Sequence, residues 1–233
     1  YLTRRIRAGY RPELRALPAV EDLEGSLDES APVGAKLHVA TGIGGLADSR
    51  TLETLVGVQA FGHLAKRAAA VGVPVIATAG HVTTLPVLEN VAASTFEDTG
   101  NANLLQADTA RFVAQEPVAY AAGVMRTLKS EDVTTNVMLG SFGDEYLLMG
   151  ETAAGRGVGQ VVGVTNPLVL PFAYATADSL LMGEEMFALA AYLERRPSQI
   201  AGLVSQDWMR LVIVAGIVVL VVAASLGLTI AYT

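Results

Sequence analysis

The chain contains 233 residues, of which 52% are hydrophobic, and its formal net charge at pH 7 is −7. This negative charge argues against a nucleic-acid-binding protein, which normally carries a basic face. The chain has no cysteine, which excludes disulfide bonds, thiolate nucleophiles and cysteine-ligated metal centres within it.

The first segment, residues 1–17, is basic and is predicted to be a juxtamembrane arm. Its only acid is Glu13, and its arginines are Arg4, Arg5, Arg7, Arg11 and Arg15. An aromatic residue followed by arginines is typical of the sequence just after a membrane-spanning helix, so we expect such a helix before Tyr1. The alternative is a basic arm that lies on anionic lipid.

The next segment, residues 18–34, is predicted to be an acidic linker. All charged residues from Glu21 to Glu29 are acids. Such a run is typical of a solvated linker or a short exposed helix.

Residues 35–196 are predicted to form one α/β domain, because strand and helix patterns alternate along them. Short apolar runs predict strands over residues 36–41, 73–78, 135–139, 160–164 and 180–182. Helical spacing and capping residues predict helices over residues 50–71, 83–94, 117–129 and 144–155, from residue 168 and over 184–195, with a further helical piece before Pro117. This order predicts a Rossmann-like or flavodoxin-like three-layer domain with a mainly parallel sheet of about five strands.

Ligands of such sheets bind beyond the carboxyl ends of the strands, where several glycines and polar residues occur. The predicted ligand-binding residues are Gly42, Gly44, Gly45, His81, Ser141, Asp144, Asn166 and Glu184. Backbone N–H groups of residues 42–45 are candidates to hold a phosphate at a helix N-terminus, although neither a GxGxxG nor a P-loop pattern is present. The alternative is a glycine turn that lets a strand and a helix pack closely.

No catalytic residue, metal ligand or cofactor is assigned from these residues. His81 is the one histidine placed for acid–base chemistry, and Ser141 follows a strand as a nucleophile would, without the G-x-S-x-G spacing. Acidic pairs at residues 144–145 and 184–185 begin predicted helices, where carboxylates favourably meet the helix dipole, and this explains them without a metal.

After a membrane-proximal connector, residues 197–210, comes an apolar stretch over residues 211–232 without a charged residue. A helix of this length spans about 33 Å at ~1.5 Å per residue, which predicts a C-terminal transmembrane helix in the lipid bilayer. Trp208 and Arg210 precede it as interfacial anchors. Small residues spaced for helix–helix packing are Gly216, Ala223, Gly227 and Ala231.

The arginines on both flanks of the domain predict its position relative to the membrane. Arg195, Arg196 and Arg210 lie before the span, and residues 1–17 are basic as well. Under the positive-inside rule, we expect the domain on the cytoplasmic side.

Four runs of sequence carry a resemblance to a known family. They are HVATGIGGL (38–46), AYAAGVM (119–125), MLGSFGDEYLLMGE (138–151) and GVTNPLVLPFAYATADSLLMGEEMFALAAYL (163–193). With the C-terminal span, the chain resembles a family of uncharacterised prokaryotic membrane proteins classed as a domain of unknown function. The resemblance implies a membrane-tethered α/β domain and transfers no catalytic residues.

Three functional hypotheses follow. The first is a membrane-anchored scaffold or ligand-sensing domain that self-associates as a homo-oligomer. The second is a membrane-tethered nucleotide- or small-molecule-binding enzyme that uses the strand-end loops. The third is a subunit of a larger membrane complex. A cleft where the strand-end loops converge favours the second, and loops packed shut by Phe142, Leu168 and Pro171 exclude it.

Overall fold

The computed structural model describes residues 4, 6, 15–30, 35–101, 105–106, 108–194 and 196–225. The chain divides into two compact units. One comprises Ala16–Leu193, and the other comprises the residues before it and those from Glu194 onward.

The first unit is built on one parallel sheet whose strand order is β3-β2-β1-β4-β5-β6. This is the order of the Rossmann fold, in which the chain builds outward from β1 first in one direction and then in the other. The strands are β1 (Lys36–Gly42), β2 (Val75–Ala79), β3 (Ala110–Phe112), β4 (Val133–Ser141), β5 (Gly159–Val164) and β6 (Ser179–Met182).

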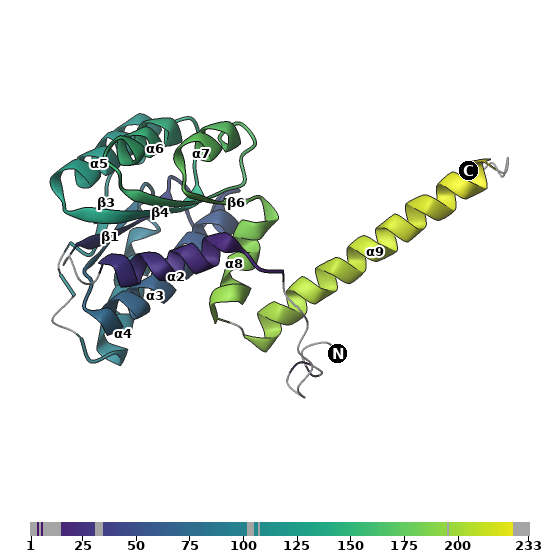
Figure 1. Ribbon diagram of the computed structural model, residues 1–233, viewed down its shortest axis with the longest axis horizontal. Coiled ribbons are helices and arrows are strands. Elements are labelled where there is room, and N and C mark those ends of the chain that lie inside the picture. Colours follow the sequence, from purple (N-terminus) through teal and green to yellow (C-terminus); the bar gives the residue numbers. More distant parts are fainter. Residues whose placement is uncertain are drawn as a thin grey trace. The chain divides into compact units, whose positions relative to one another are not determined.

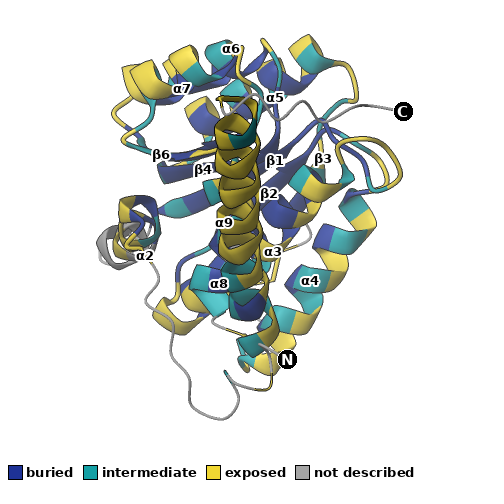
Figure 2. Ribbon diagram, turned by 90° about the vertical axis from the view of Figure 1, so that its right-hand side faces the viewer, coloured by how far each residue is buried: buried dark blue, intermediate teal, exposed yellow. Residues whose placement is uncertain are grey.

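Helices cover both faces of this sheet, which confirms the predicted three-layer α/β fold (Figure 1). One face carries α2 (Pro18–Ser30), α3 (Thr51–Val71), α4 (Leu85–Asp98) and α8 (Glu184–Glu194), and the other carries α5 (Pro117–Ser130), α6 (Tyr146–Gly155) and α7 (Leu170–Thr176). Figure 2 shows the strands buried between helices whose outer surfaces are exposed. The strands read as apolar on both sides because side chains alternate between two buried layers: Val39 and Val137 face α3, and Ala40 and Met138 face α5 and α6.

Strand β3 replaces the helical piece that the sequence predicts before Pro117. It is only three residues long and pairs with β2 alone, through contacts such as Ala77 opposite Ala110. Its central residue, Arg111, forms an ion pair with Glu131 at 3.1 Å instead of entering an apolar layer. So short an edge strand with a charged centre gives no apolar run to detect.

The acidic stretch after residue 17 belongs to the α/β unit. It forms α2, and Leu17, Ala19 and Leu23 are buried in the same cluster as α3. The acids lie between apolar residues at helical spacing, so the helix presents an apolar stripe to the core. The compact unit that contains the sheet thus includes this helix and extends from Ala16 to Leu193.

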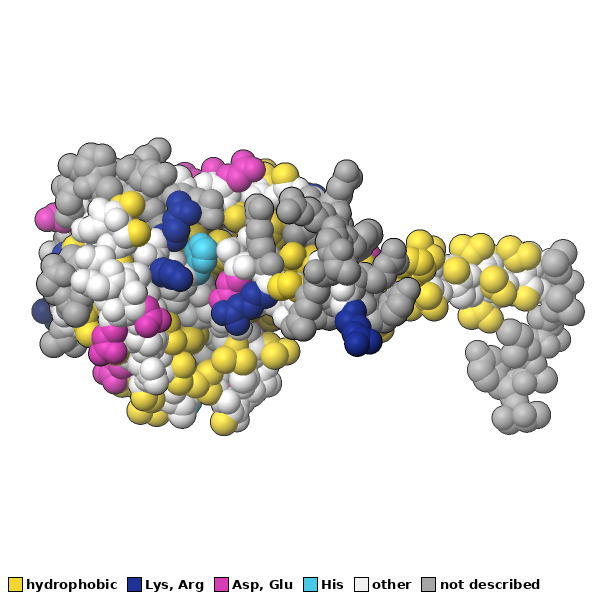
Figure 3. All heavy atoms as spheres, turned by 90° about the horizontal axis from the view of Figure 1, so that it is seen from below, with side chains coloured by type: hydrophobic (Ala, Val, Ile, Leu, Met, Phe, Trp, Pro, Cys, Tyr) yellow, Lys and Arg dark blue, Asp and Glu magenta, His cyan; other side chains and the backbone are white. Residues whose placement is uncertain are grey.

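The second unit contains α9 (Pro197–Ser225), a single helix long and apolar enough to cross a membrane. Hydrophobic side chains line its exposed surface (Figure 3). The predicted connector is helical and continuous with the span, because Pro197 occupies the first turn and no later proline interrupts it. Several predicted residues lie outside the described part of the chain: Arg5, Arg7, Arg11, Arg195, Gly227 and Ala231.

Candidate functional site

The candidate site is a cavity of about 410 Å³ at the carboxyl ends of β1, β4 and β5. Strands β1 and β4 are neighbours in the sheet. The chain continues from β1 toward β2 and from β4 toward β5, so the two connections run in opposite directions away from this point, which we call the β1–β4 divergence. Such a divergence is the usual ligand-binding position in open α/β sheets. The lining residues are Ile43, Ser49, Arg50, Glu53, Ser141, Phe142, Gly143, Thr165 and Asn166.

The backbones of β1 and β4 touch at the base of this site. Gly42 has φ +76°, and an added Cβ would lie 2.1 Å from the carbonyl oxygen of Ser141. That oxygen accepts a hydrogen bond of 3.0 Å from the Ile43 amide. The close approach requires a residue without a side chain at position 42 and places Ser141 at the mouth of the β1 loop.

Ser141 offers an unused hydroxyl to the cavity. The residue is only 8% exposed, and its Oγ makes no hydrogen bond to any described residue. Buried hydroxyls are normally bonded, because leaving one unpaired costs about 1–3 kcal/mol. A hydroxyl left free beside a cavity is therefore placed to bond whatever enters it.

Two opposite charges line the same cavity from the start of α3. Glu53 lies three residues after Arg50, and its carboxylate accepts a short hydrogen bond from the Thr165 hydroxyl. Within the described residues, neither side chain forms an ion pair. The cavity is therefore lined by one positive and one negative group.

The Asn166 side chain lines the cavity, but both of its polar atoms contact neighbouring backbone groups. Its Oδ1 accepts a hydrogen bond of 3.1 Å from the Leu168 amide, which closes a local turn after β5. Its Nδ2 lies 3.5 Å from the carbonyl oxygen of Phe142, a long contact that links the β5 and β4 loops.

The glycine loop after β1 already binds a carboxylate of this chain. Gly45 N–H donates to Oδ2 of Asp48 at 2.9 Å, and Arg50 N–H donates to Oδ1 at 2.8 Å. These bonds, that from Gly45 first, lower the pKa of Asp48. The Gly42 amide donates to the hydroxyl of Tyr120 at 3.3 Å. A phosphate on this loop would have to displace Asp48 from the Gly45 and Arg50 amides. Phosphate binding by residues 42–45 therefore stays a prediction.

The structure brings some of the predicted residues together and leaves others apart. Ser141 and Asn166 line the cavity, and Gly44 lies directly beside it: an added Cβ would be 3.0 Å from the Cβ of Arg50 and 3.2 Å from that of Ser141. Gly42 and Gly45 shape the same loop, and the His81 ring covers Gly45 at 2.9 Å from the position of an added Cβ.

The remaining predicted residues do not line the cavity. His81 bonds through Nδ1 to the Thr83 hydroxyl at 2.8 Å, at the end of β2. Asp144 is exposed beyond Gly143, and Glu184 follows β6, which β5 separates from β4. The described part of the chain holds no group of three or more His, Asp or Glu side chains suited to a metal ion.

Sequence reasoning missed Ser49, Arg50, Glu53 and Thr165, all of which line the cavity. Arg50 is the first residue of the helix predicted over residues 50–71, and the structure places it at the N-cap of α3, one residue before the helix begins. The sequence could have indicated Arg50 and Glu53, because in this fold the first turn of the helix after β1 lies next to the β1–β4 divergence, where ligands bind. Thr165 directly precedes Asn166 at the predicted strand end, and its bond to Glu53 is what the three-dimensional structure adds.

A chain of buried polar groups runs beneath the site. His38 on β1 bonds through Nδ1 to Oδ1 of Asn136 at 2.7 Å and through Nε2 to the Thr78 hydroxyl at 3.0 Å. That hydroxyl lies 3.3 Å from the Tyr120 hydroxyl, which also accepts the Gly42 amide. Burial lowers the pKa of His38 to about 4 and raises that of Tyr120, so both are neutral at pH 7. The network fixes the end of β1 and does not reach the cavity lining.

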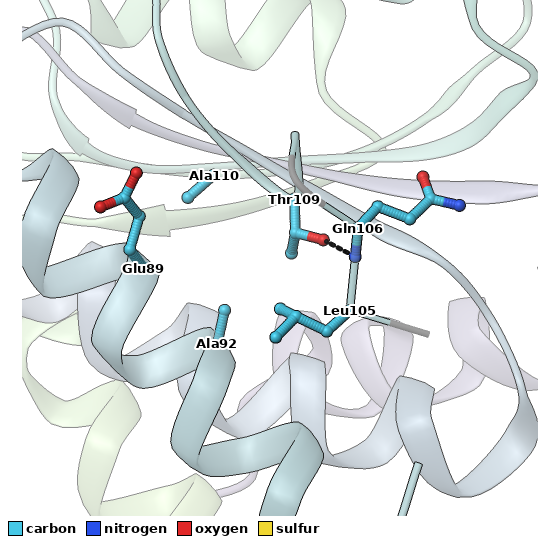
Figure 4. A pocket seen from close by; sticks show the side chains of 6 residues that line it. All are labelled: Glu89, Ala92, Leu105, Gln106, Thr109 and Ala110. Carbon is cyan, nitrogen blue, oxygen red and sulfur yellow. Dashed lines mark hydrogen bonds between the residues drawn. The ribbon is translucent and has the colours of Figure 1, made fainter. Parts of the chain in front are cut away.

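Two further cavities are less suited to a ligand. One, of about 390 Å³, lies between α4 and the beginning of β3, with Glu89 and Thr109 among its lining residues (Figure 4). It sits at the amino end of a strand, opposite to the usual ligand edge. The other, also about 390 Å³, is formed by residues of α5 such as Met125 and Lys129.

Comparison with known proteins gives a family and no described relative. No curated protein and no solved structure matches the chain. A family model described as "Domain of unknown function (DUF6754)" matches residues 1–232. The match confirms the resemblance to a domain of unknown function, and the chain belongs to the DUF6754 family.

Proposed function

We propose that this protein is a membrane-tethered domain that binds a small polar molecule in the cavity at the β1–β4 divergence and acts as a ligand sensor. The observation that carries the proposal is the free hydroxyl of Ser141, nine-tenths buried, in a cavity where the loops after β1, β4 and β5 meet. A volume of about 410 Å³ falls within the range of small-molecule sites, roughly 300–1,000 Å³.

Binding is better supported than catalysis. Phe142 and Gly143 line the cavity without closing it, so the loops are not packed shut. However, no histidine lines it, and His81 is bonded to Thr83 outside it. Glu53 is the only candidate general base among the described lining residues, and its carboxylate bonds to Thr165 and not to Ser141, whereas a hydroxyl nucleophile needs a base within hydrogen-bond reach.

Tethering to the membrane is proposed from α9, with the α/β unit on the cytoplasmic side. The helix is long and apolar enough to span a bilayer; Arg196 directly precedes it, and Arg210 lies within it just before the apolar stretch that starts at Leu211. Because the chain has no cysteine, a single Ser94→Cys substitution on exposed α4 gives a clean reporter. In intact cells it is expected to resist a membrane-impermeant maleimide and to react after permeabilisation. Labelling of intact cells would place the domain outside.

Native mass spectrometry of the protein in lipid nanodiscs tests the binding proposal. We expect a small-molecule adduct, or one after incubation with a metabolite library, that Ser141→Ala reduces. The matched control is Ser94→Ala, because the Ser94 hydroxyl bonds only to its own helix, at 3.1 Å from the Val91 carbonyl. Absence of any adduct, or equal adducts on both variants, would reject this cavity as the site. The same spectra report subunit number, which tests self-association and the complex-subunit hypothesis.

A further inference from the structure

We propose that the ligand is a zwitterion of the amino-acid class, with its carboxylate on Arg50 and its ammonium group on Glu53. This inference rests on the proposed function and adds the chemistry of the ligand. It is carried by the Arg50 guanidinium and the Glu53 carboxylate, which form no ion pair with a described residue and line one cavity together with the free Ser141 hydroxyl.

The positions of the two charges match a ligand that carries both signs close together. Arg50 is the N-cap residue of α3, and Glu53 follows three residues later in the first turn of the helix. An arginine and a glutamate at this spacing normally attract each other, yet Glu53 bonds Thr165. Neither the Arg50 guanidinium nor the second oxygen of the Glu53 carboxylate bonds to a described residue.

Phosphorylated ligands fit this cavity poorly. The Asp48 carboxylate already accepts the Gly45 and Arg50 amides, which a phosphate on the loop would need. The Glu53 carboxylate lines the cavity and repels a second anion placed beside it. A carboxylate with a neighbouring ammonium group brings one compensating charge for each side chain.

Neutral ligands such as sugars also match less well. A ligand that fills the cavity removes water from Arg50 and Glu53 and must replace that solvation. Hydroxyl groups do so through weaker neutral bonds, whereas an ionic partner gives each charge a charge-assisted hydrogen bond. The Ser141 hydroxyl then donates a further hydrogen bond to the ligand carboxylate.

The test is thermal unfolding of the protein in nanodiscs with each standard L-amino acid, followed by analogues of the best binder. The panel also contains its carboxylic acid without the amine, its amine without the carboxylate, glucose, inorganic phosphate and AMP. We expect a saturable rise in Tm with at least one amino acid, and a Kd weaker by about tenfold or more for both one-charge analogues.

Variants locate the binding. Arg50→Gln and Glu53→Gln are each expected to weaken amino-acid binding by about tenfold or more, and Arg50→Lys to retain part of it. Arg156→Gln on the exposed end of α6 and Glu89→Gln in the cavity of Figure 4 are matched controls that should leave the Kd unchanged.

The outcomes separate this inference from the proposed function. Binding of glucose, phosphate or AMP that Ser141→Ala weakens would overturn the zwitterion and keep the ligand-binding proposal. Amino-acid binding that is insensitive to Arg50→Gln and Glu53→Gln would also overturn it. No response to the panel, with no adduct from the metabolite library, would overturn both. Circular dichroism of each variant shows whether a loss of binding reflects a loss of fold.

Discussion

His38 and Asn136 stand opposite each other on neighbouring parallel strands, with Nδ1 of His38 2.7 Å from Oδ1 of Asn136. An amide oxygen only accepts hydrogen bonds, so Nδ1 carries the proton and Nε2 accepts from the Thr78 hydroxyl at 3.0 Å. The ring is fully buried and both its nitrogens are used by neutral partners. The arrangement therefore holds a neutral histidine in the centre of the sheet.

This histidine predicts acid sensitivity of the fold. Burial lowers its pKa from 6.5 to about 4, so between these values the unfolded chain binds a proton that the folded chain does not. The free energy of unfolding is therefore highest above pH 6.5 and falls as the pH drops toward 4. From pH 7 to pH 5 we expect a loss on the order of 2 kcal/mol.

Guanidinium unfolding in mild detergent, followed by the near-UV signal of the buried tyrosines, measures this change. His38→Gln should remove most of the difference between pH 7 and pH 5, whereas His81→Gln should leave it intact. Glu131, whose pKa the Lys36 bond lowers below 4.5, loses its contribution only at lower pH, so it does not affect this window. Equal pH dependence in wild type and His38→Gln would contradict the prediction.

Replacing a helical glycine by alanine is expected to change the free energy of unfolding differently at Gly57 and at Gly25. An added Cβ would lie 2.1 Å from the carbonyl oxygen of Leu139 on β4, a backbone atom that cannot move freely. The strain should outweigh the helix propensity of alanine, which is worth about 1 kcal/mol, so Gly57→Ala lowers the free energy of unfolding. Gly25→Ala on α2 meets nothing within 4 Å and should leave stability unchanged or raise it. The same denaturation assay compares them, and a neutral Gly57→Ala would show that α3 can move away from β4.

Leu23 tests whether α2 belongs to the folded unit. Its side chain is fully buried in the cluster that contains Phe61 and Leu64 of α3. Leu23→Ala should cost about 2–5 kcal/mol, as for other buried leucines. The control is Leu52→Ala, because Leu52 is 68% exposed and should lose less than about 0.5 kcal/mol. Similar small losses for both would make α2 a peripheral segment, as the acidic composition suggests.

The comparison of sequence and structure shows where local patterns are sufficient. Long apolar repeats such as residues 51–71 and buried runs such as residues 159–164 predict their elements to within a few residues. The short strand β3 and the packing of α2 depend on partners distant in the sequence, and their local composition favours other structures. Strand order likewise follows from long-range pairing.

The sequence predicts where the candidate site lies in the fold, but it identifies only some of the residues that line it. Strand-end reasoning finds Ser141 and Asn166, because their position after a parallel strand places them at the ligand edge. It also includes Glu184, which follows β6. The sequence does not give the strand order, so it does not show that β6 lies at the edge of the sheet, away from the β1–β4 divergence. Arg50 and Glu53 look like ordinary residues of a first helical turn until Thr165 is seen to bond to Glu53.

Asp48 provides the last prediction. Its carboxylate accepts two loop amides and thus occupies the position where glycine loops of this fold hold a phosphate. Asp48→Ala should lower the Tm, because the Gly45 and Arg50 amides lose their acceptor, and inorganic phosphate or sulfate should restore part of the loss. Wild type should show no such rise, since Asp48 competes from within the loop at far higher effective concentration. Asp144→Ala removes an exposed acid of the neighbouring loop and should behave as wild type, which separates a vacated anion site from a change in net charge. If phosphate raises the Tm of wild type and of Asp48→Ala equally, Asp48 does not fill an anion site and does not disfavour a phosphorylated ligand in the cavity.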